Sequence, residues 1–406
     1  MNVLFLSYNG LLEPILPSQA VPYLKGLAGK GYEFVLLTYE KKKDLERVGK
    51  RGVEALKEDL KKDGIEWRYL RYHKIPPLFS TFFDIFAGIA YTLYIIKARH
   101  VKIVHIRGIT PGIIMIMLSS VLKVKILFDM RGLLAEEYVG GGIWKEDSIP
   151  FRLVKRAEKQ MLMIADAVTV LTQKHLELNK SLEYLAKRKI PIEVVPCCVD
   201  MAKFDYEKPD SAGLKAQLGL KDKLVLMYSG KMGTFYLIDE MLEFFRYMVR
   251  IVPETILFVI TNDEPDILIA RARRLNVDID KIVIKQKISY AEMPRYMRIA
   301  DAGIFFINPY KKIGSSPIKM GEFLASGIPV IINPGVGDTE ELVRENKVGV
   351  VVEKFKDECY EKAVRELFDM KKEAQALRRR CRDTADKYLS LLNGIKKYHM
   401  IYKALE

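Results

Sequence analysis

A lysine and a glutamate three residues apart carry the sharpest chemical signal in this sequence. They are Lys319 and Glu322 in the stretch "GSSPIKMGEFLASGIPVIINPG", and their spacing places both on one face of a helix. Ser316 is predicted to cap that helix, Pro317 to be its first residue and Gly327 to end it. The amide groups of its first turn would then be available to bind an anion.

The residues alone leave two interpretations of this pair open. A phosphate at the helix start and a hydroxyl-bearing group at Glu322 would together describe a nucleoside diphosphate with its ribose. The alternative is a surface Lys–Glu pair on an edge helix. Gly321 lies in the middle of the same helix, where glycine costs about 1 kcal/mol relative to alanine. We therefore expect some group to approach the helix closely at this point.

Charge and composition narrow the class of protein. The 406 residues include 66 Lys and Arg against 52 Asp and Glu, a formal charge of +14, which favours an anionic partner. Basic and acidic residues are interspersed, and no basic stripe with interleaved aromatics or zinc-finger spacing indicates nucleic-acid binding, so no nucleic acid is expected. The four cysteines form no CxxC pair, and the N-terminus is typical of a strand and not of a signal peptide. These features predict a cytoplasmic protein with reduced thiols.

One apolar segment approaches the length of a membrane span. It is "PPLFSTFFDIFAGIAYTLYIIKARH", but it contains Asp84 and Gly88 and begins with two prolines. A buried helix or a helix on the membrane surface is therefore predicted. Together with the net charge, the segment predicts peripheral contact with the cytoplasmic face of a membrane.

Apolar runs of strand length alternate with helical stretches along the chain. This alternation is typical of an α/β fold with a parallel sheet covered by helices on both faces. The pattern restarts at "KLVLMYSGKMG", so the sequence predicts two Rossmann-like, doubly wound domains that face a cleft. The domains are expected at residues 1–204 and 205–384, with a last helix at about 385–406 that packs back on the first. The expected strands are "NVLFLSY", "YEFVLLTY", "VKIVHIR", "KILFDMR", "ADAVTVLT", "IEVVP", "LVLMYS", "TILFVIT", "IVIKQ", "AGIFFI" and "PVIIN".

Several motifs together resemble one enzyme family. "SPIKMGEFLASGIPVI" with "GDTEELVRENKVGVVV" is similar to the donor-nucleotide motif of the family 4 glycosyltransferases, which are retaining enzymes of the GT-B fold, also called group 1 glycosyl transferases. "EPILPSQAVPYLKGLAGKGYEFVLLTYE" resembles the first loop and helix of a subgroup, "FDMRGLLAEEYV" its acceptor-side motif and "VVPCCVD" its interdomain hinge. The resemblance covers most of the chain, up to about residue 352.

The resemblance assigns expected roles to individual residues. It implies that Glu322 accepts hydrogen bonds from the ribose diol of the donor. Lys231, which follows Gly230 in "SGKMG", stands where the family has a basic residue, usually arginine, that neutralises the diphosphate. Gly10 lies in the loop that lets the donor or acceptor approach the first sheet. The alternative for Gly10 is an ordinary Asn-Gly turn.

The sequence departs from the family pattern at three places. The family often has a second glutamate eight residues before Glu322, where this chain has Gly314. A second basic residue is common a few positions after Lys231, where this chain reads "TFYLIDE". Many members have a histidine that contacts the donor sugar, where this chain has "DMRG", so that contact would fall to Arg131 or Asp129. Donor-sugar identity and acceptor geometry are the properties that these departures affect.

Sugar transfer requires neutralised charge on the leaving diphosphate and a positioned hydroxyl nucleophile. Lys231, Lys319 and the amide groups after Ser316 can supply the charge. The resemblance implies front-face attack with retention, in which the departing phosphate takes the acceptor proton and no protein base is needed. Acids that could orient the acceptor are Asp129, Glu136 and Glu137, the last two being equally compatible with solvent-facing helix ends. His105 fits either a structural histidine at a strand end or a sugar contact.

The predicted function is therefore retaining transfer of a sugar from a nucleotide-diphosphate sugar to a hydroxyl. The donor is expected to be a UDP- or GDP-sugar, and the acceptor a glycan or a lipid-linked sugar in polysaccharide, glycolipid or cell-surface glycan synthesis. No cofactor and no metal are expected, because no Asp-x-Asp signature occurs in a candidate cleft loop. The alternatives are a nucleotide-sugar epimerase on the same fold and a non-catalytic nucleotide-sugar binding protein.

Overall fold

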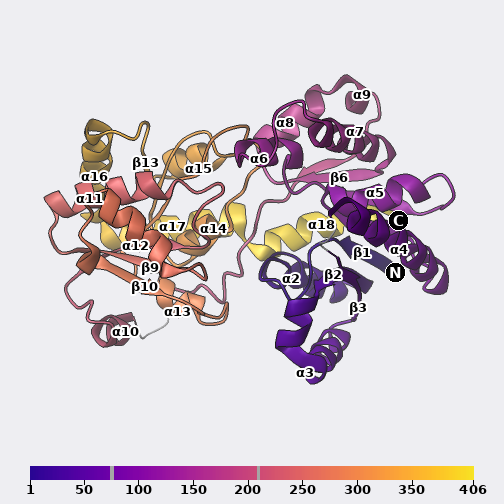
Figure 1. The fold of residues 1–406 in the computed structure, drawn as a ribbon, viewed down its shortest axis with the longest axis horizontal. Helices are drawn as coiled ribbons and strands as arrows, with labels where there is room; N and C mark the ends of the chain where they lie inside the picture. The colour runs from indigo at the N-terminus through magenta and orange to yellow at the C-terminus, as the bar shows by residue number, and fades with distance from the viewer. Residues whose placement is uncertain (74–76, 208–210) are drawn as a thin grey trace. The chain divides into compact units, whose positions relative to one another are not determined.

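The computed structural model describes residues 1–73, 77–207 and 211–406. The chain forms two compact units, which Figure 1 shows as ribbons. Their segments are Met1–Val139, Trp144–Pro196 and Leu391–Glu406 in unit 1, and Gly140–Ile143 and Cys197–Ser390 in unit 2. Apart from the short segment Gly140–Ile143, the chain passes into unit 2 at Cys197 and returns to unit 1 at Leu391. The sequence predicted these borders near residues 205 and 385.

Unit 1 contains a sheet of seven parallel strands in the order β3-β2-β1-β4-β5-β6-β7. The order reverses at β1 and β4, where the carboxyl ends of neighbouring strands leave room for ligands in open α/β sheets. The strands are β1 (Asn2–Ser7), β2 (Glu33–Lys41), β3 (Ile65–Tyr72), β4 (Ile103–Arg107), β5 (Lys125–Asp129), β6 (Ala167–Val170) and β7 (Ile192–Val194).

The helices of unit 1 connect these strands, and one of them comes from the C-terminus. They are α1 (Ile15–Gln19), α2 (Val21–Ala28), α3 (Lys42–Lys62), α4 (Pro77–Ala98), α5 (Ile109–Leu118), α6 (Leu134–Gly140), α7 (Ile149–Ile164), α8 (Gln173–Ser181), α9 (Glu183–Ala186) and α18 (Leu391–Leu405). The ring of Tyr398 on α18 packs edge-on against Tyr23 on α2, with 5.4 Å between ring centres. α18 is therefore part of the packing of unit 1.

Unit 2 repeats this architecture with six parallel strands in the order β10-β9-β8-β11-β12-β13. The strands are β8 (Leu224–Ser229), β9 (Thr255–Ile260), β10 (Ile282–Lys285), β11 (Ala302–Phe305), β12 (Val330–Ile332) and β13 (Gly349–Val351). The helices are α10 (Ser211–Gln217), α11 (Ile238–Ile251), α12 (Pro265–Arg274), η1 (Ile279–Lys281), α13 (Met293–Met297), α14 (Ile318–Ala325), α15 (Thr339–Asn346), α16 (Asp357–Lys371) and α17 (Ala374–Leu389). The predicted α/β class with two doubly wound sheets is confirmed.

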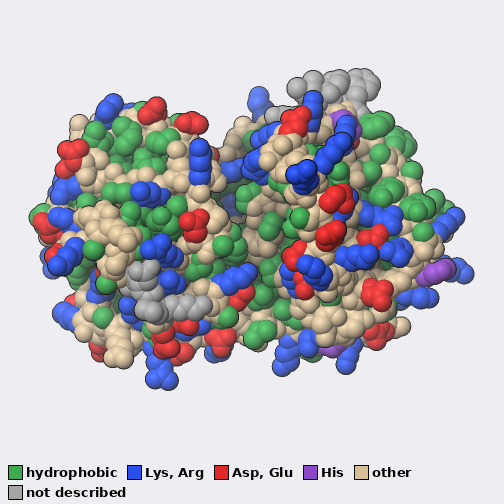
Figure 2. Space-filling model, turned by 90° about the horizontal axis from the view of Figure 1, so that it is seen from below, with side chains coloured by type: hydrophobic (Ala, Val, Ile, Leu, Met, Phe, Trp, Pro, Cys, Tyr) green, Lys and Arg blue, Asp and Glu red, His purple; other side chains and the backbone are tan. Residues whose placement is uncertain are grey.

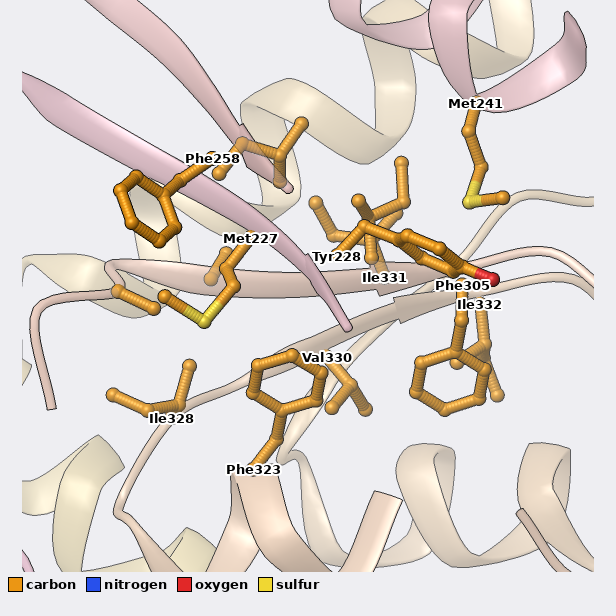
Figure 3. Packing of buried hydrophobic residues seen from close by; sticks show 14 of the residues in the cluster. Met227, Tyr228, Met241, Phe258, Phe305, Phe323, Ile328, Val330, Ile331 and Ile332 are labelled. Carbon is orange, nitrogen blue, oxygen red and sulfur yellow. The ribbon is translucent and has the colours of Figure 1, made fainter. Parts of the chain in front are cut away.

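The apolar core of unit 2 holds α14 against its sheet. Phe323 points from α14 toward β11 and β12, on the face of the sheet that carries Val330 and Phe305 (Figure 3). A Cβ atom on Gly303 of β11 would lie 2.6 Å from the Phe323 ring, so glycine makes room for this ring. The packing fixes the rotation of α14 about its axis and hence the direction in which its other side chains point.

Two strands of the structure were missing from the sequence-based prediction. β3 and β13 are the outer strands at opposite edges of their respective sheets. β3 alternates buried Ile65 and Trp67 with less buried polar residues, and β13 is only three residues long. Charged residues interrupt the apolar residues of β3, so it lacks the continuous apolar run that identified the other strands. β13 does lie in such a run, "VGVVV", which carried a strand signal that the prediction did not use.

The surface shows how the positive charge is distributed. In Figure 2, Lys and Arg side chains are spread over the visible face and mixed with Asp and Glu. Exposed ion pairs at helical spacing, such as Lys57 with Glu54 on α3, account for part of this mixture. Among the helices of the described residues, none combines the length and the apolar character needed to cross a membrane.

Candidate functional site

The first turn of α14 lies at the carboxyl edge of the unit 2 sheet, between β11 and β12. The predicted helix start is wrong by one residue, because Pro317 is the residue before the first turn and no side chain caps the helix. Ser316 is engaged elsewhere: its Oγ accepts a hydrogen bond of 3.1 Å from the amide of Cys197. Gly327 does end the helix, in the left-handed region with φ of 69°. Ser316 therefore holds the segment that begins at Cys197 and does not cap α14.

The close approach expected at Gly321 is made by the same segment, at residues 197–199. A Cβ atom on Gly321 would lie 3.4 Å from the Val199 side chain and 3.8 Å from the Cys197 carbonyl oxygen. Val199 is buried, and its amide donates to the carbonyl of Leu389 at the end of α17. The glycine in mid-helix thus serves packing within unit 2, and it explains why the chain joins this unit at Cys197.

Lys319 points into an aromatic pocket within unit 2. Its Nζ lies 3.8 Å from the ring centre of Tyr236 and 4.2 Å from that of Tyr228. The residue is only 6% exposed, and no hydrogen-bond partner of Nζ occurs among the residues that the structure describes. Burial lowers the pKa of Lys319 to about 7, although the neighbouring Glu322 acts in the opposite direction.

Glu322 is the second buried charge on α14. It is 7% exposed, and burial raises the pKa of its carboxyl to about 7, against the effects of Lys319 and of a hydrogen bond from Tyr290. The alternative of a solvent-exposed Lys–Glu pair is therefore wrong. Each group is held in a site that disfavours its charged form, and such shifts are frequent where ligands bind.

The loop after β8 covers Lys319. Gly230 has a φ of 133°, and a Cβ atom there would lie 2.9 Å from Lys319 Nζ. Lys231 itself is exposed, and its carbonyl oxygen accepts a hydrogen bond from the Tyr228 hydroxyl. The amide of Met232 donates to the Asp263 carboxylate, so both bonds hold the peptide group that follows Lys231. Unit 2 thus brings Lys231, Gly230, Lys319, Glu322 and the start of α14 to the carboxyl edge of one sheet.

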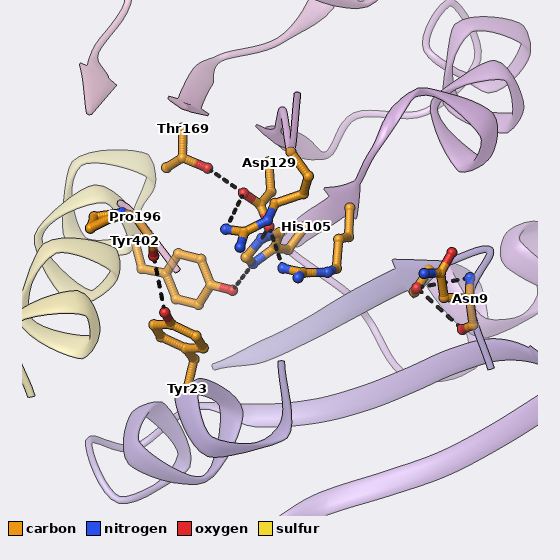
Figure 4. A network of polar contacts seen from close by, with 10 residues as sticks. Asn9, Tyr23, His105, Asp129, Thr169, Pro196 and Tyr402 are labelled. Atoms are coloured by element: carbon orange, nitrogen blue, oxygen red, sulfur yellow. Dashed lines mark hydrogen bonds and ion pairs between the residues drawn. The ribbon is translucent and has the colours of Figure 1, made fainter. Parts of the chain in front are cut away.

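Asp129 lies at the end of β5 in unit 1 and is surrounded by basic side chains (Figure 4). Its carboxylate accepts hydrogen bonds of 2.9 Å from Arg107 and from the Thr169 hydroxyl, and Arg131 lies 3.5 Å away. Burial alone would raise the pKa of Asp129, but the positive charges of Arg131 and Arg107 outweigh it and hold the pKa well below its usual range. Asp129 is thus ionised, 1% exposed and fully engaged by neighbouring side chains.

His105 belongs to the same cluster and links it to α18. Its Nδ1 lies 2.7 Å from the Tyr402 hydroxyl, and its Nε2 lies 3.8 Å from Asp129 (Figure 4). Burial lowers the pKa of His105 below its usual value, so the imidazole is neutral at pH 7. Because the residue is 2% exposed, this geometry favours the structural histidine over a sugar contact.

Gly10 makes room for a side chain of unit 1. A Cβ atom at this position would lie 2.5 Å from Oε2 of Glu40. That buried carboxylate accepts hydrogen bonds from the amides of Leu11 (2.6 Å) and Leu12 (3.1 Å). The conformation at Gly10 has no positive φ, so the glycine is explained by this contact.

The acids of α6 differ from each other. Glu136 is 9% exposed and pairs at 2.9 Å with Lys155, so the prediction of a solvent-facing acid is wrong for it. Glu137 lies beside Gly132, where a Cβ atom would be 2.6 Å from its carboxylate. Glu136 is thus held by an ion pair within unit 1.

Sequence reasoning missed the three tyrosines that surround the α14 pair. Tyr228 lies on β8, Tyr236 follows the loop, and Tyr290 precedes α13. Of the three, only Tyr236 could have been found from the sequence as a site residue, because it lies in the "TFYLIDE" stretch that departs from the family pattern. Among the described residues, no three His, Cys, Asp or Glu side chains are grouped so that they could hold a metal ion.

Comparisons with known proteins agree with this architecture. Residues 211–387 match the family model described as "Glycosyl transferases group 1". No curated protein matches the sequence. Among solved structures, a sucrose-phosphate synthase from Thermosynechococcus elongatus is 15% identical with a TM-score of 0.73, covering 100% of this chain and 98% of that chain.

Two further structures show the same likeness. A glycosyltransferase from Rickettsia africae is 17% identical with a TM-score of 0.72, covering 100% of this chain and 98% of its own. The Anabaena protein Alr3699/HepE, solved in complex with UDP, is 11% identical with a TM-score of 0.71, and both chains are covered completely. The chain therefore has the GT-B class of fold along its whole length, and over residues 211–387 it is similar to the group 1 glycosyl transferases.

Proposed function

We propose that this protein is a glycosyltransferase that moves a sugar from a nucleotide-diphosphate sugar to a hydroxyl acceptor. The observation that carries the proposal is the buried pair of Lys319 and Glu322 on α14, which lies inside the segment similar to group 1 glycosyl transferases. A diphosphate would satisfy the ammonium, and the ribose diol would satisfy the carboxylate, so both buried charges gain partners in the complex.

The donor would be a UDP- or GDP-sugar. HepE, a structural neighbour, has been solved with UDP and with UDP-glucose, which favours uridine as the first nucleotide to test. Lys231 is exposed at the carboxyl edge of β8, where its charge would reach the leaving diphosphate. We propose that Ser316 and Pro317 contribute by fixing the start of α14, whose amide groups face the phosphates.

Transfer with retention is the mechanism that these residues suit best. The departing phosphate would take the acceptor proton, so no protein base is required. Asp129 is engaged by Arg107 and Thr169, so we propose that it positions Arg131 and does not itself accept a proton. The acceptor would be a glycan or a lipid-linked sugar, as in the synthesis of polysaccharides or cell-surface glycans.

The proposal is tested by offering UDP-, GDP- and ADP-sugars to the protein. The correct nucleotide should raise the melting temperature, because a ligand that binds the native state stabilises it by mass action. Release of the nucleoside diphosphate in the presence of cell-derived acceptors should then follow, and NMR of the product should show the donor's anomeric configuration. Glu183→Ala, on an exposed ion pair of α9, is a matched control that should leave both results unchanged.

The same assay separates the alternatives. An epimerase would convert the nucleotide sugar in the absence of any acceptor, and a binding protein would show the melting shift without turnover. Neither alternative is favoured by the family match. Added EDTA should leave the rate unchanged, because lysine side chains and helix amides supply the positive charge in this proposal; loss of activity with EDTA would contradict it.

We also propose weak peripheral contact with an acidic membrane on the cytoplasmic side. Three phenylalanines of α4 are about 60% exposed, namely Phe82, Phe83 and Phe86. Residues 74–76, and the side chains of residues 77–79 and 81, lie outside the described part of this predicted segment. Flotation with anionic liposomes at low salt should recover the wild type, and replacement of the three phenylalanines by serine should abolish recovery. Absence of wild-type flotation would end this idea.

A further inference from the structure

The environment of Lys319 is unusual for a buried ammonium. Its Nζ faces the rings of Tyr236 and Tyr228 at 3.8 and 4.2 Å, with the Phe305 ring at 5.9 Å, and it has no hydrogen-bond partner within the described residues. Aromatic faces attract a cation, but they supply no hydrogen-bond acceptor. The pocket therefore fixes the position of the ammonium and leaves its three N–H donors unused.

An exposed glycine at the end of β8 lies beside this ammonium. Gly230 is exposed, and a side-chain carbon there would come within 2.9 Å of Nζ. Tyr228 contributes twice, because its ring lies under the ammonium while its hydroxyl donates to the carbonyl of Lys231. The loop that carries Lys231 and the pocket that holds Lys319 are thus built on the same tyrosine.

We infer that Lys319 is the second cation of the diphosphate site and that Tyr228 and Tyr236 are positioning residues that aim its ammonium beneath Gly230. The inference rests on the proposed function and extends it. Tyr236 lies in the stretch after Lys231 where a second basic residue is common in the resembling family. In this chain the second positive charge comes from Lys319 on α14 instead. Tyr236, which lies in the stretch after Lys231, helps to position the Lys319 ammonium.

The two lysines should then differ in what they recognise. Lys231 is exposed, so water and salt screen its charge. Lys319 is buried, and a charge in a dry site interacts more strongly with an anion that reaches it. Lys319 should therefore distinguish a nucleoside diphosphate from a monophosphate, which lacks the outer phosphate.

The test compares UDP with UMP by calorimetric titration; if GDP or ADP gives the larger melting shift, that nucleotide and its monophosphate are used. Lys319→Met keeps an unbranched side chain of similar length and removes the charge. We expect it to weaken UDP binding about tenfold or more and to leave UMP binding within about twofold. It should also raise the melting temperature, because an unpaired buried charge is replaced by an apolar group. Lys187→Met, on an exposed ion pair of α9, is the matched control.

The aromatic pocket is tested at Tyr236. Tyr236→Phe keeps the ring and should bind UDP like the wild type, whereas Tyr236→Leu should lose part of the preference for UDP over UMP. A purely structural role would reduce the binding of both nucleotides together, and that result would overturn the inference. Unchanged UDP affinity in Lys319→Met would overturn it as well. If the wild type binds no nucleoside diphosphate at all, the proposed function itself is wrong.

Discussion

Two buried charge clusters, one in each unit, are built in opposite ways. In unit 1, Asp129 is surrounded by Arg107, Arg131 and the Thr169 hydroxyl, and its pKa is held low by the two positive charges. In unit 2, the ammonium of Lys319 has aromatic faces for neighbours, and burial shifts the pKa values of Lys319 and Glu322 to about 7. Both clusters lie at the carboxyl edge of a parallel sheet.

In the function that we propose, the unit 1 cluster stabilises the fold and the unit 2 cluster binds a ligand. A buried charge is tolerated when other charges and hydrogen bonds satisfy it, as they do for Asp129. The pair on α14 is satisfied only in part, so it costs stability in the empty protein. Removing the charge of Asp129 should therefore destabilise unit 1. Removing a charge of the α14 pair should leave the stability of unit 2 unchanged or raise it.

The largest effect is expected at Asp129. Asp129→Ala leaves two partly buried guanidinium groups without their shared carboxylate and should destabilise unit 1 by about 3 kcal/mol. Chemical denaturation measures this loss. Asp59→Ala, whose side chain is 61% exposed in an ion pair with Lys25, should change stability by less than about 1 kcal/mol. An equally small loss at Asp129 would show that the unit 1 cluster is not the stabilising one.

Lys231 should affect turnover more than binding. Charge on the leaving diphosphate grows toward the transition state, so Lys231→Ala should lower kcat about 100-fold and change the Kd of the nucleotide sugar much less. Steady-state rates give kcat, and calorimetry with the same donor gives the Kd. Equal losses in both would mean that Lys231 only holds the ground state.

Glu322 should affect donor binding with little change in folding. Glu322→Ala should weaken binding of the nucleoside diphosphate by about 1.5 to 3 kcal/mol, the usual contribution of hydrogen bonds to a charged group. Glu322→Gln can still accept the hydrogen bond from Tyr290, and its donor affinity should fall between alanine and wild type. Calorimetric titrations beside melting curves decide the matter, since unchanged affinity would remove the ribose assignment.

The smallest effect is a dependence of stability on pH. The pKa of Glu322 is raised by folding, so its contribution to stability is present below pH 4.5 and is lost as pH rises to about 7. The pKa of Lys319 is lowered, so its contribution is present above pH 10.5 and is lost as pH falls to about 7. Tyr228, Tyr236 and Tyr290 face the pair and stay neutral over this range, because burial raises the pKa of each.

The contributions of Glu322 and Lys319 together predict that the free energy of unfolding has a minimum near pH 7. Relative to the double variant Lys319→Met/Glu322→Gln, the wild type should show a dip in unfolding free energy of the order of 1 kcal/mol. Denaturation curves at several pH values from 5 to 9 measure the difference. Parallel curves for the two proteins would mean that the pair does not titrate as its burial indicates.

The sequence by itself determined the central strands, the two doubly wound sheets and the end of α14. These features are local: continuous apolar runs identify strands buried on both faces, and Gly327 supplies the left-handed residue that ends a helix. The spacing of Lys319 and Glu322 likewise fixed their common face. The edge strand β3 lacked such a signal, because charged residues interrupt its apolar residues.

Only the tertiary structure decided what the site residues touch. Ser316 accepts a hydrogen bond from the amide of Cys197 and does not cap its helix, and Gly10 makes room for Glu40. Lys319 became a buried ammonium because Phe323 fixes the rotation of α14 and Tyr228 and Tyr236 arrive from β8 and the loop that follows it. Such contacts join residues far apart in the chain, and burial depends on all the elements that surround a side chain, so no local pattern encodes them.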